Sequence, residues 1–139
     1  PSIAADISRT ARVVDGDTID VGTTRIRLWG IDAPETKQTC TRDGSEWACG
    51  REVAAALSDW IGQKVVRCQE RARDRYGRTV ALCFVNGEDV SAWMVSHGYA
   101  VAFRHYSLDY VAAEDVAHRN GVGIWSSRFQ MPWDWRQSH

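Results

Sequence analysis

The 139-residue chain has no apolar run near the roughly 18 residues that a membrane-spanning helix needs, so we expect no association with a bilayer. It also lacks a basic excess: the formal net charge is -1, which argues against a broad polyanion-binding surface. Internal repeats, low-complexity segments and Cys-x-x-Cys zinc motifs are missing as well. With 44% apolar and 25% charged residues, the composition matches one globular domain.

Lysine is scarce, and arginine is locally concentrated. Only Lys37 and Lys64 are lysines among the 17 basic residues. A coding bias toward arginine would explain that ratio, but it would not explain the clustering between residues 67 and 78. The guanidinium fork suits contact with phosphate oxygens, so any phosphate recognition should be local. The clustered residues are Arg67, Arg71, Arg73, Arg75 and Arg78, opposed by Glu70 and Asp74.

Alternating apolar residues and turn signals predict five strands. Three of them lie between Ala11 and Ile31, separated at Gly16 and Gly22. Two more flank the arginine-rich turn and close at Asn86-Gly87, which suits positive φ. The expected strand cores are Val13-Val14, Ile19–Val21, Arg25–Leu28, Val65-Val66 and Thr79–Val85.

Helical spacing of apolar residues predicts three helices. The helices and their glycine stop signals are Val53–Ile61 with Gly62, Val90–His97 with Gly98, and Leu108–Arg119 with Gly121. Polar residues 36–46 suggest an exposed loop, and the tail from Trp125 to His139 shows no clear period. A helix between the third and fourth strands fits an α+β fold: a small, partly open, five-stranded Greek-key barrel of the OB type with three helices.

Two aspartates are candidate metal ligands. Asp17 opens the second predicted strand and Asp32 closes the third, so both carboxylates are expected at one end of the sheet. Together with a main-chain carbonyl and waters they would suit a hard cation such as Ca²⁺. The simpler interpretation is that Asp-Gly-Asp forms only a turn, which such tripeptides often do. The distance between Asp17 and Asp32 in the fold separates the two interpretations.

One glutamate and two arginines would complete a phosphodiester-cleaving site. Glu35 follows Pro34, whose rigid ring fixes the exit of the chain and would aim the carboxylate at a water near the metal. Arg27 lies five residues before Asp32 and Arg78 opens the fifth predicted strand, so both would project toward a phosphate held over the metal. Taken singly, either arginine is more usually a partner in a surface ion pair.

Four cysteines form two close pairs, Cys40 with Cys49 and Cys68 with Cys83, which indicates disulfides or free buried thiols. If the turn between the last two strands centres on residues 75 and 76, residues 68 and 83 face each other within disulfide reach. We therefore favour an oxidising compartment and expect a secreted or periplasmic protein, with a targeting segment removed or omitted.

Three segments together resemble the staphylococcal nuclease family. They are Asp17-Thr18, Arg27-Leu-Trp-Gly-Ile-Asp-Ala-Pro-Glu35 and Asp74-Arg-Tyr-Gly-Arg78, in the family's order and at similar spacing, and the likeness extends to Gly121-Val-Gly-Ile-Trp-Ser126. The resemblance implies an OB barrel with three helices and calcium-dependent cleavage of DNA and RNA, single-stranded or frayed, that leaves 3′-phosphate ends. It implies one domain over residues 1–139, with a core at about 9–126 and a C-terminal tail at 127–139, and no obligate protein partner.

The resemblance also implies residue roles. Asp17, Asp32 and the carbonyl of Ala33 would be metal ligands. Glu35 would act on the attacking water, and Arg27 and Arg78 would hold the scissile phosphate. The substrate-binding positions would be Arg75 and Tyr76 at a terminal phosphate, and Phe103 with either His105 or Tyr106 at a base. Unlike the strongly basic, cysteine-free members best known in the family, this chain is nearly neutral and has four cysteines.

Two other functions compete with a nuclease. The first is a binding module that kept the barrel and lost turnover, although none of Asp17, Asp32, Glu35, Arg27 and Arg78 is missing. The second is a phosphodiesterase whose substrate is not a nucleic acid, because a metal and an arginine clamp would serve any phosphodiester. In that case stacking residues such as Phe103 would not be needed.

Overall fold

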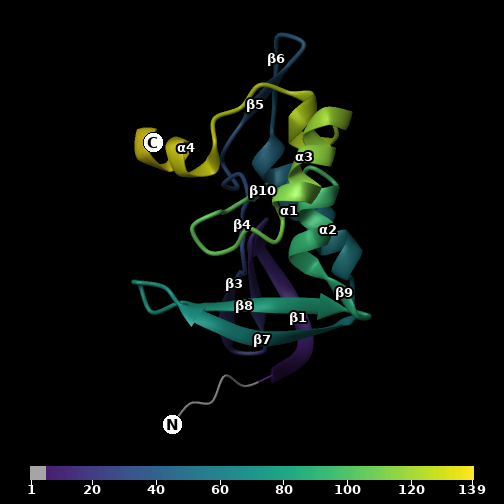
Figure 1. Ribbon diagram of the computed structural model, residues 1–139, viewed down its shortest axis with the longest axis vertical. Coiled ribbons are helices and arrows are strands. Elements are labelled where there is room, and N and C mark those ends of the chain that lie inside the picture. The colour runs from purple at the N-terminus through teal and green to yellow at the C-terminus, as the bar shows by residue number, and fades with distance from the viewer. Residues whose placement is uncertain (1–5) are drawn as a thin grey trace.

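Among residues 6–139, which the computed structural model describes, five strands form a closed barrel (Figure 1). Neighbouring strands pair in the order β3-β2-β1-β7-β8, and a parallel pairing of β3 with β8 closes the ring. The predicted OB barrel is thus confirmed, although it is closed rather than partly open. The strands are β1 (Asp6–Asp15), β2 (Thr18–Val21), β3 (Thr24–Leu28), β7 (Val65–Arg73) and β8 (Thr79–Val85), and β9 (Glu88–Asp89) extends the sheet beyond β8.

Alternating side chains of the strands fill the barrel, which is why periodicity predicted them. Ile19, Ile26, Leu28 and Val66 are all completely buried. The turn after β8 has positive φ at both Asn86 and Gly87, 51° and 80°, as that dipeptide predicts.

The three predicted helices are present as α1 (Cys49–Ile61), α2 (Val90–Ser96) and α3 (Val111–Asn120). The indole of Trp60 on α1 stacks on Trp93 of α2, with centroids 4.4 Å apart. The predicted start of the third helix at Leu108 is wrong: that side chain is 70% exposed, and the helix begins at Val111. Its C-terminus is capped by Gly121 in the left-handed conformation, as expected.

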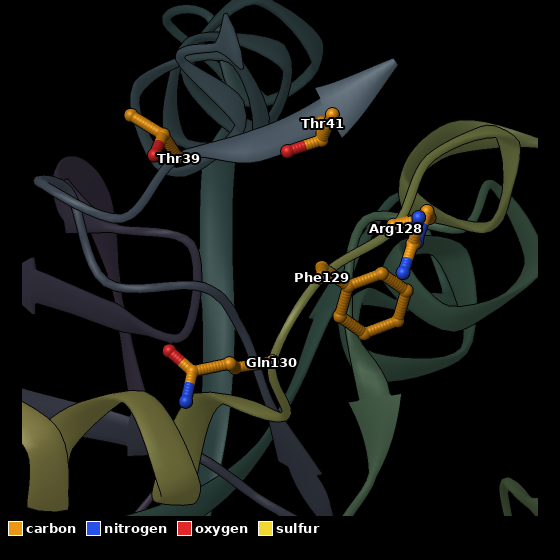
Figure 2. A pocket seen from close by; sticks show the side chains of 5 residues that line it. All are labelled: Thr39, Thr41, Arg128, Phe129 and Gln130. Atoms are coloured by element: carbon orange, nitrogen blue, oxygen red, sulfur yellow. The ribbon is translucent and has the colours of Figure 1, made fainter. Parts of the chain in front are cut away.

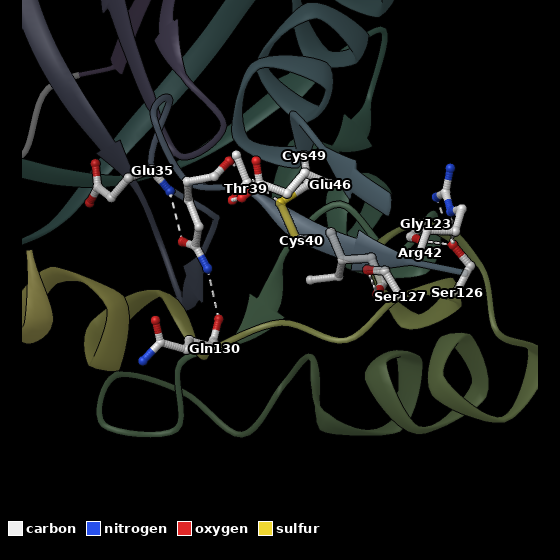
Figure 3. The surroundings of a disulfide bond; sticks show 12 residues. Glu35, Thr39, Cys40, Arg42, Glu46, Cys49, Gly123, Ser126, Ser127 and Gln130 are labelled. Atoms are coloured by element: carbon white, nitrogen blue, oxygen red, sulfur yellow. Dashed lines mark hydrogen bonds between the residues drawn. A yellow bond between two sulfur atoms is a disulfide. The ribbon is translucent and has the colours of Figure 1, made fainter. Parts of the chain in front are cut away.

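Residues 36–46 are not a simple loop, which corrects the sequence prediction. They contain a β-hairpin of β5 (Cys40–Arg42) and β6 (Ser45–Trp47), with positive φ at Asp43 and Gly44. The Arg42 guanidinium lies 3.8 Å from the ring centre of Trp47, which ties the two strands together at the surface. The predicted Cys40–Cys49 disulfide joins this hairpin to the start of α1 (Figure 3).

The second predicted disulfide, Cys68–Cys83, links β7 and β8 at opposed positions of the antiparallel ladder. The register expected from the turn holds as far as Glu70 opposite Ala81. An irregularity between Glu70 and Ala72 then shifts the pairing by one residue, so Ala72 faces Val80. This bulge lies next to the arginine-rich turn and offsets the last two pairs of the ladder by one residue.

The C-terminal tail contains structure that the sequence did not predict. A 3-10 turn (Gly123–Ser126) is followed by a fourth α-helix of the described chain, α4 (Pro132–Ser138). Between them the chain runs beside β5, where Thr41 and Arg128 exchange two backbone hydrogen bonds of 2.8 Å (Figure 1). Over residues 6–139, no helix is long and apolar enough to cross a membrane.

Candidate active site

Asp17 lies in the turn between β1 and β2 and is almost completely buried. Its Oδ2 accepts a hydrogen bond from the backbone N–H of Ala33 at 2.9 Å, and its Oδ1 accepts one from Thr18 Oγ1 at 3.1 Å. Gly16 permits this approach, because a Cβ there would lie 2.7 Å from the Cβ of Ala33. The Asp-Gly-Asp segment is therefore a turn, and its second carboxylate also reaches the segment after Asp32.

Asp32 lies on β4 (Ile31–Asp32), a two-residue strand that pairs with β10 (Val101–Ala102). This corrects the prediction that Asp32 closes the third strand. The chain turns first at Gly30, whose φ is +76°. A Cβ on Gly30 would also lie 2.6 Å from the ring of Tyr110, so close packing as well as backbone angle requires glycine. The turn delivers the Asp32 side chain to a fully buried position.

Arg27 lies between the two aspartates. Its Nη1 is 3.6 Å from Asp17 Oδ2, and its Nη2 is 3.5 Å from Asp32 Oδ1. Nη2 also donates to the carbonyl of Ile31 at 3.4 Å. Burial alone would lower the pKa of Arg27, but the charges of Asp17 and Asp32 raise it. The structure thus brings the predicted phosphate-binding arginine and the two predicted metal-binding aspartates together.

Glu35 follows Asp32 in the same segment, with its side chain 31% exposed. Its backbone N–H donates to Gln38 Oε1 at 3.3 Å, and its carbonyl accepts from the Gln38 backbone N–H at 2.8 Å. A Cβ on Gly50 in α1 would lie 1.7 Å from the Glu35 carbonyl oxygen, so this end of the helix packs directly on the Glu35 backbone. Helix α1 therefore positions the predicted water-activating carboxylate.

Gln38 connects the Glu35 segment to the tail. The side chain is completely buried, and its Nε2 donates to the carbonyl of Gln130 at 2.8 Å. Both ends of its amide therefore have partners on separate segments of the chain.

We expect Gln38→Leu to lower the free energy of unfolding by about 2 kcal/mol, because the Glu35 N–H and the Gln130 carbonyl lose part-buried hydrogen bonds. Thermal unfolding should show a lower midpoint for Gln38→Leu, whereas the exposed neighbour Thr36→Ala should match the wild type. Equal midpoints for Gln38→Leu and wild type would show that this connection does not stabilise the fold.

Arg136 of α4 also enters the site. Its Nη2 donates to Asp32 Oδ2 at 2.7 Å, and its Nη1 donates to Asp32 Oδ1 at 3.1 Å and to Glu35 Oε1 at 2.8 Å. These hydrogen bonds raise the pKa of Arg136 above its usual value. Sequence reasoning missed this residue, because the tail has no apolar period and Arg136 belongs to no motif.

The carboxylates of the site affect one another's protonation. Burial, together with the charge of Asp17, raises the pKa of Asp15 to about 8. Burial also raises the pKa of Asp32 to about 6, opposed by the hydrogen bonds from Arg136. Burial alone would raise the pKa of Asp17, but the charge of Arg27 and its hydrogen bonds lower it. Asp15, the first residue of the Asp-Gly-Asp turn and given no role from the sequence, thus belongs to this acidic cluster.

The donor set suits a hard cation, although no three His, Cys, Asp or Glu side chains of residues 6–139 are arranged to hold a metal ion. The set expected from the sequence is smaller: the carboxylates of Asp17 and Asp32 with the carbonyl of Ala33. All of its donors are oxygens. One of these donors, the Asp32 carboxylate, already binds a positive group, the Arg136 guanidinium. The residues present therefore fit a cation such as Ca²⁺.

The turn between β7 and β8 holds the predicted Arg75, Tyr76 and Arg78 away from this cluster. Arg78 forms its ion pair with Asp74 at 2.5 Å rather than with a site carboxylate. Tyr76 is 70% exposed, and the guanidiniums of Arg75 and Arg78 lie 5.1 and 5.6 Å from its ring centre. These three side chains therefore lie together on the turn between β7 and β8, which projects from the barrel (Figure 1).

Aromatic side chains form a wall beside Arg27, whose guanidinium lies 5.8 Å from the ring centre of Phe103. The rings of Phe103 and Tyr106 are 5.5 Å apart. Trp29 adds a ring 5.4 Å from Tyr106, and Trp133 of α4 adds one 5.9 Å from Phe103. Phe103 and Tyr106 thus lie together, and His105, the alternative to Tyr106, lies in the same group with its ring 5.8 Å from that of Phe103. The two tryptophans were not predicted.

A surface pocket opens between β5 and the tail (Figure 2). Side chains of Thr39 and Thr41 line one side, and those of Arg128, Phe129 and Gln130 line the other. None of the residues predicted to form the catalytic site lines this pocket, so it is a neighbouring feature rather than the reaction centre.

The closed barrel with an acidic cluster and a buried arginine defines an OB-fold domain of the nuclease-like class. Residues 25–127 match the family described as Staphylococcal nuclease homologue, and the chain belongs to that family. The resemblance drawn from the three sequence segments is thereby confirmed.

Similar proteins carry different names. The Succinoglycan biosynthesis protein ExoI of Rhizobium meliloti (strain 1021) is 39% identical over 129 residues, which cover 90% of this chain and 68% of that protein. A protein named Micrococcal nuclease from Shigella flexneri is 34% identical over a match that covers 99% of this chain and 84% of that protein. A protein of Haemophilus influenzae, named Uncharacterized endonuclease, is also 34% identical, covering 93% and 72%. The relatives named as nucleases support a nuclease.

Proposed function

We propose that this chain is a calcium-dependent nuclease that hydrolyses phosphodiester bonds of DNA and RNA in single-stranded or frayed segments and leaves 3′-phosphate ends. The observation that supports this most is the convergence of Asp17, Arg27, Asp32 and Glu35 around one place. The family and the nuclease names of relatives point to the same class of reaction.

In this proposal Asp17, Asp32 and the Ala33 carbonyl would hold Ca²⁺, and the bound ion would supply positive charge beside the scissile phosphate. The Ala33 N–H fixes one oxygen of Asp17 through a hydrogen bond. Burial keeps the Asp32 carboxylate out of bulk water. Its charge therefore acts more strongly on a nearby cation than it would in water. The two aspartates are thus oriented before any ligand binds.

Glu35 takes a proton from the attacking water as the new oxygen–phosphorus bond forms. The bond from phosphorus to the 5′ oxygen breaks, the 5′ oxygen takes up a proton from water and leaves as a 5′-hydroxyl end, and the phosphate stays on the 3′ oxygen. Arg27 and Arg78 offset the negative charge that develops on the phosphate oxygens. Arg78 must exchange its ion pair with Asp74 for the phosphate, because Asp74 is its partner in the free protein.

Substrate binding is assigned to two groups of side chains. Arg75 and Tyr76, on the exposed turn, would contact a terminal phosphate. The rings of Phe103 and Tyr106, beside Arg27, would stack on a base, and base–aromatic stacking tolerates any sequence.

We further infer a secreted or periplasmic protein, supported by two disulfides in the described chain. We infer one domain over residues 1–139, its core at about 9–126 and its tail at 127–139, acting without an obligate protein partner. The first five residues of that range lie outside the described residues. The hydrogen bonds between the tail and β5 support treating both as one unit.

Incubation with labelled single-stranded DNA and RNA, with Ca²⁺ or with a chelator, tests the proposal. We expect cleavage only with Ca²⁺, and fragments that gain a label at the 3′ end only after phosphatase treatment. Absence of cleavage with Ca²⁺ would contradict the nuclease assignment. Equal cleavage in chelator would contradict the role given to the metal.

A further inference from the structure

The guanidinium of Arg136 covers Asp32 from the solvent side. Both oxygens of the Asp32 carboxylate accept hydrogen bonds from it, at 2.7 and 3.1 Å, and one arm continues to Glu35 at 2.8 Å. The Asp32 side chain has no exposed surface, whereas 37% of the Arg136 side chain is exposed. The guanidinium therefore stands between this carboxylate and the water outside.

The segment that carries Arg136 is attached to the body of the protein at several points. Arg128 pairs with Thr41 through two backbone hydrogen bonds of 2.8 Å. The Gln130 carbonyl accepts from the buried Gln38 side chain. These contacts hold the start of α4 against the site, so Arg136 meets Asp32 without a long flexible connection.

A divalent cation and Arg136 cannot occupy Asp32 together in this arrangement. Each oxygen of this carboxylate already accepts from the guanidinium, Nη2 of Arg27 lies 3.5 Å from Oδ1, and the Asp32 side chain has no exposed surface left for a second cation. A second positive ion on the same oxygens would also be repelled by the guanidinium at close range. Binding of the cation therefore requires the Arg136 contact to break.

We propose that Arg136 competes with the divalent cation for Asp32: it occupies this carboxylate in the metal-free protein and leaves it when the cation binds. The proposal rests on the proposed function, since it takes Asp32 as a metal ligand. The coupling between the Arg136–Asp32 contact and cation binding is reciprocal. Arg136 lowers the affinity for the cation by a certain factor, and the bound cation weakens the Arg136–Asp32 contact by the same factor. Helix α4 thus sets the cation concentration at which the site fills.

Isothermal titration of Ca²⁺ into the full chain tests this coupling. We expect Arg136→Ala to bind Ca²⁺ about tenfold more tightly than wild type, equivalent to about 1.4 kcal/mol. Arg136→Lys should fall between them, because lysine keeps the charge but cannot make the two-armed contact. Gln137→Ala, a change to the exposed neighbour on α4, should bind like wild type.

A second measurement uses the wild-type protein alone. In ¹⁵N spectra, we expect the Nε–Hε signal of Arg136 to shift and to exchange faster with water as Ca²⁺ is added. Calcium binding to wild type with unchanged or weaker affinity in Arg136→Ala, or with an unaltered Arg136 signal, would overturn this proposal and leave the proposed function standing. No calcium binding in any variant would overturn both.

Discussion

Replacing Glu35 with glutamine should lower kcat on single-stranded DNA by about 10²–10⁴-fold, because the amide cannot accept the proton of the attacking water. The shape of the side chain is retained, and the amide oxygen can still accept from Arg136, which now bonds to Glu35 Oε1. The carboxylate is partly exposed, so the change should shift the unfolding midpoint only slightly. Initial rates at saturating substrate, with thermal unfolding measured in parallel, check both statements.

Glu46→Gln is the matched control for this prediction. Glu46 is an exposed glutamate on β6, outside the acidic cluster. Its replacement by glutamine removes the same charge as Glu35→Gln. It should retain wild-type turnover. Full activity in Glu35→Gln would remove Glu35 from the reaction, and a loss of activity accompanied by unfolding would show a structural role instead.

The barrel could be predicted because its information is local. From Ala81 to Val85, β8 alternates fully buried and partly buried residues, and turn dipeptides such as Asn86-Gly87 mark strand ends. Even the opposition of Cys68 and Cys83 followed from the position of one turn. The register near the arginine-rich turn could not be predicted, because the bulge after Glu70 depends on how the barrel closes and not on any residue type.

Elements formed by distant partners escaped prediction. The two-residue strand containing Asp32 exists because it pairs with Val101 and Ala102, far along the chain. The β5–β6 hairpin is polar on its surface, and Thr41 is held by Arg128 of the tail. Neither segment is long enough for a periodic signal, so only the folded chain reveals them.

The site divides in the same way. Asp17, Arg27 and Asp32 were predicted as site residues from the sequence segments. In the structure Arg27 lies within ion-pair distance of both aspartates. Arg136 reaches that cluster from 104 residues beyond Asp32, and no sequence signal marks it. Arg78 differs for a local reason: Asp74, four residues earlier, captures its guanidinium across the turn.

Removing the Cys68–Cys83 disulfide should lower the free energy of unfolding by about 3 kcal/mol in the chain-entropy model, because the two cysteines are 15 residues apart. For a domain of this size that corresponds to a fall of about 10 °C in Tm. Both residues are buried on the barrel strands, and the double variant to alanine leaves their partner strands paired. Urea unfolding followed by tryptophan fluorescence measures the loss.

The Cys40–Cys49 disulfide provides the comparison, because the two bonds differ in what they hold. Its cysteines are 9 residues apart, so the same model gives a slightly smaller loss, about 2.5 kcal/mol. Cys49 opens α1 next to Gly50, which packs on the Glu35 backbone. Removing Cys40–Cys49 should therefore lower turnover at temperatures where the protein is fully folded. Removing Cys68–Cys83 should leave turnover there unchanged. Equal turnover in both double variants would show that the hairpin disulfide does not position Glu35.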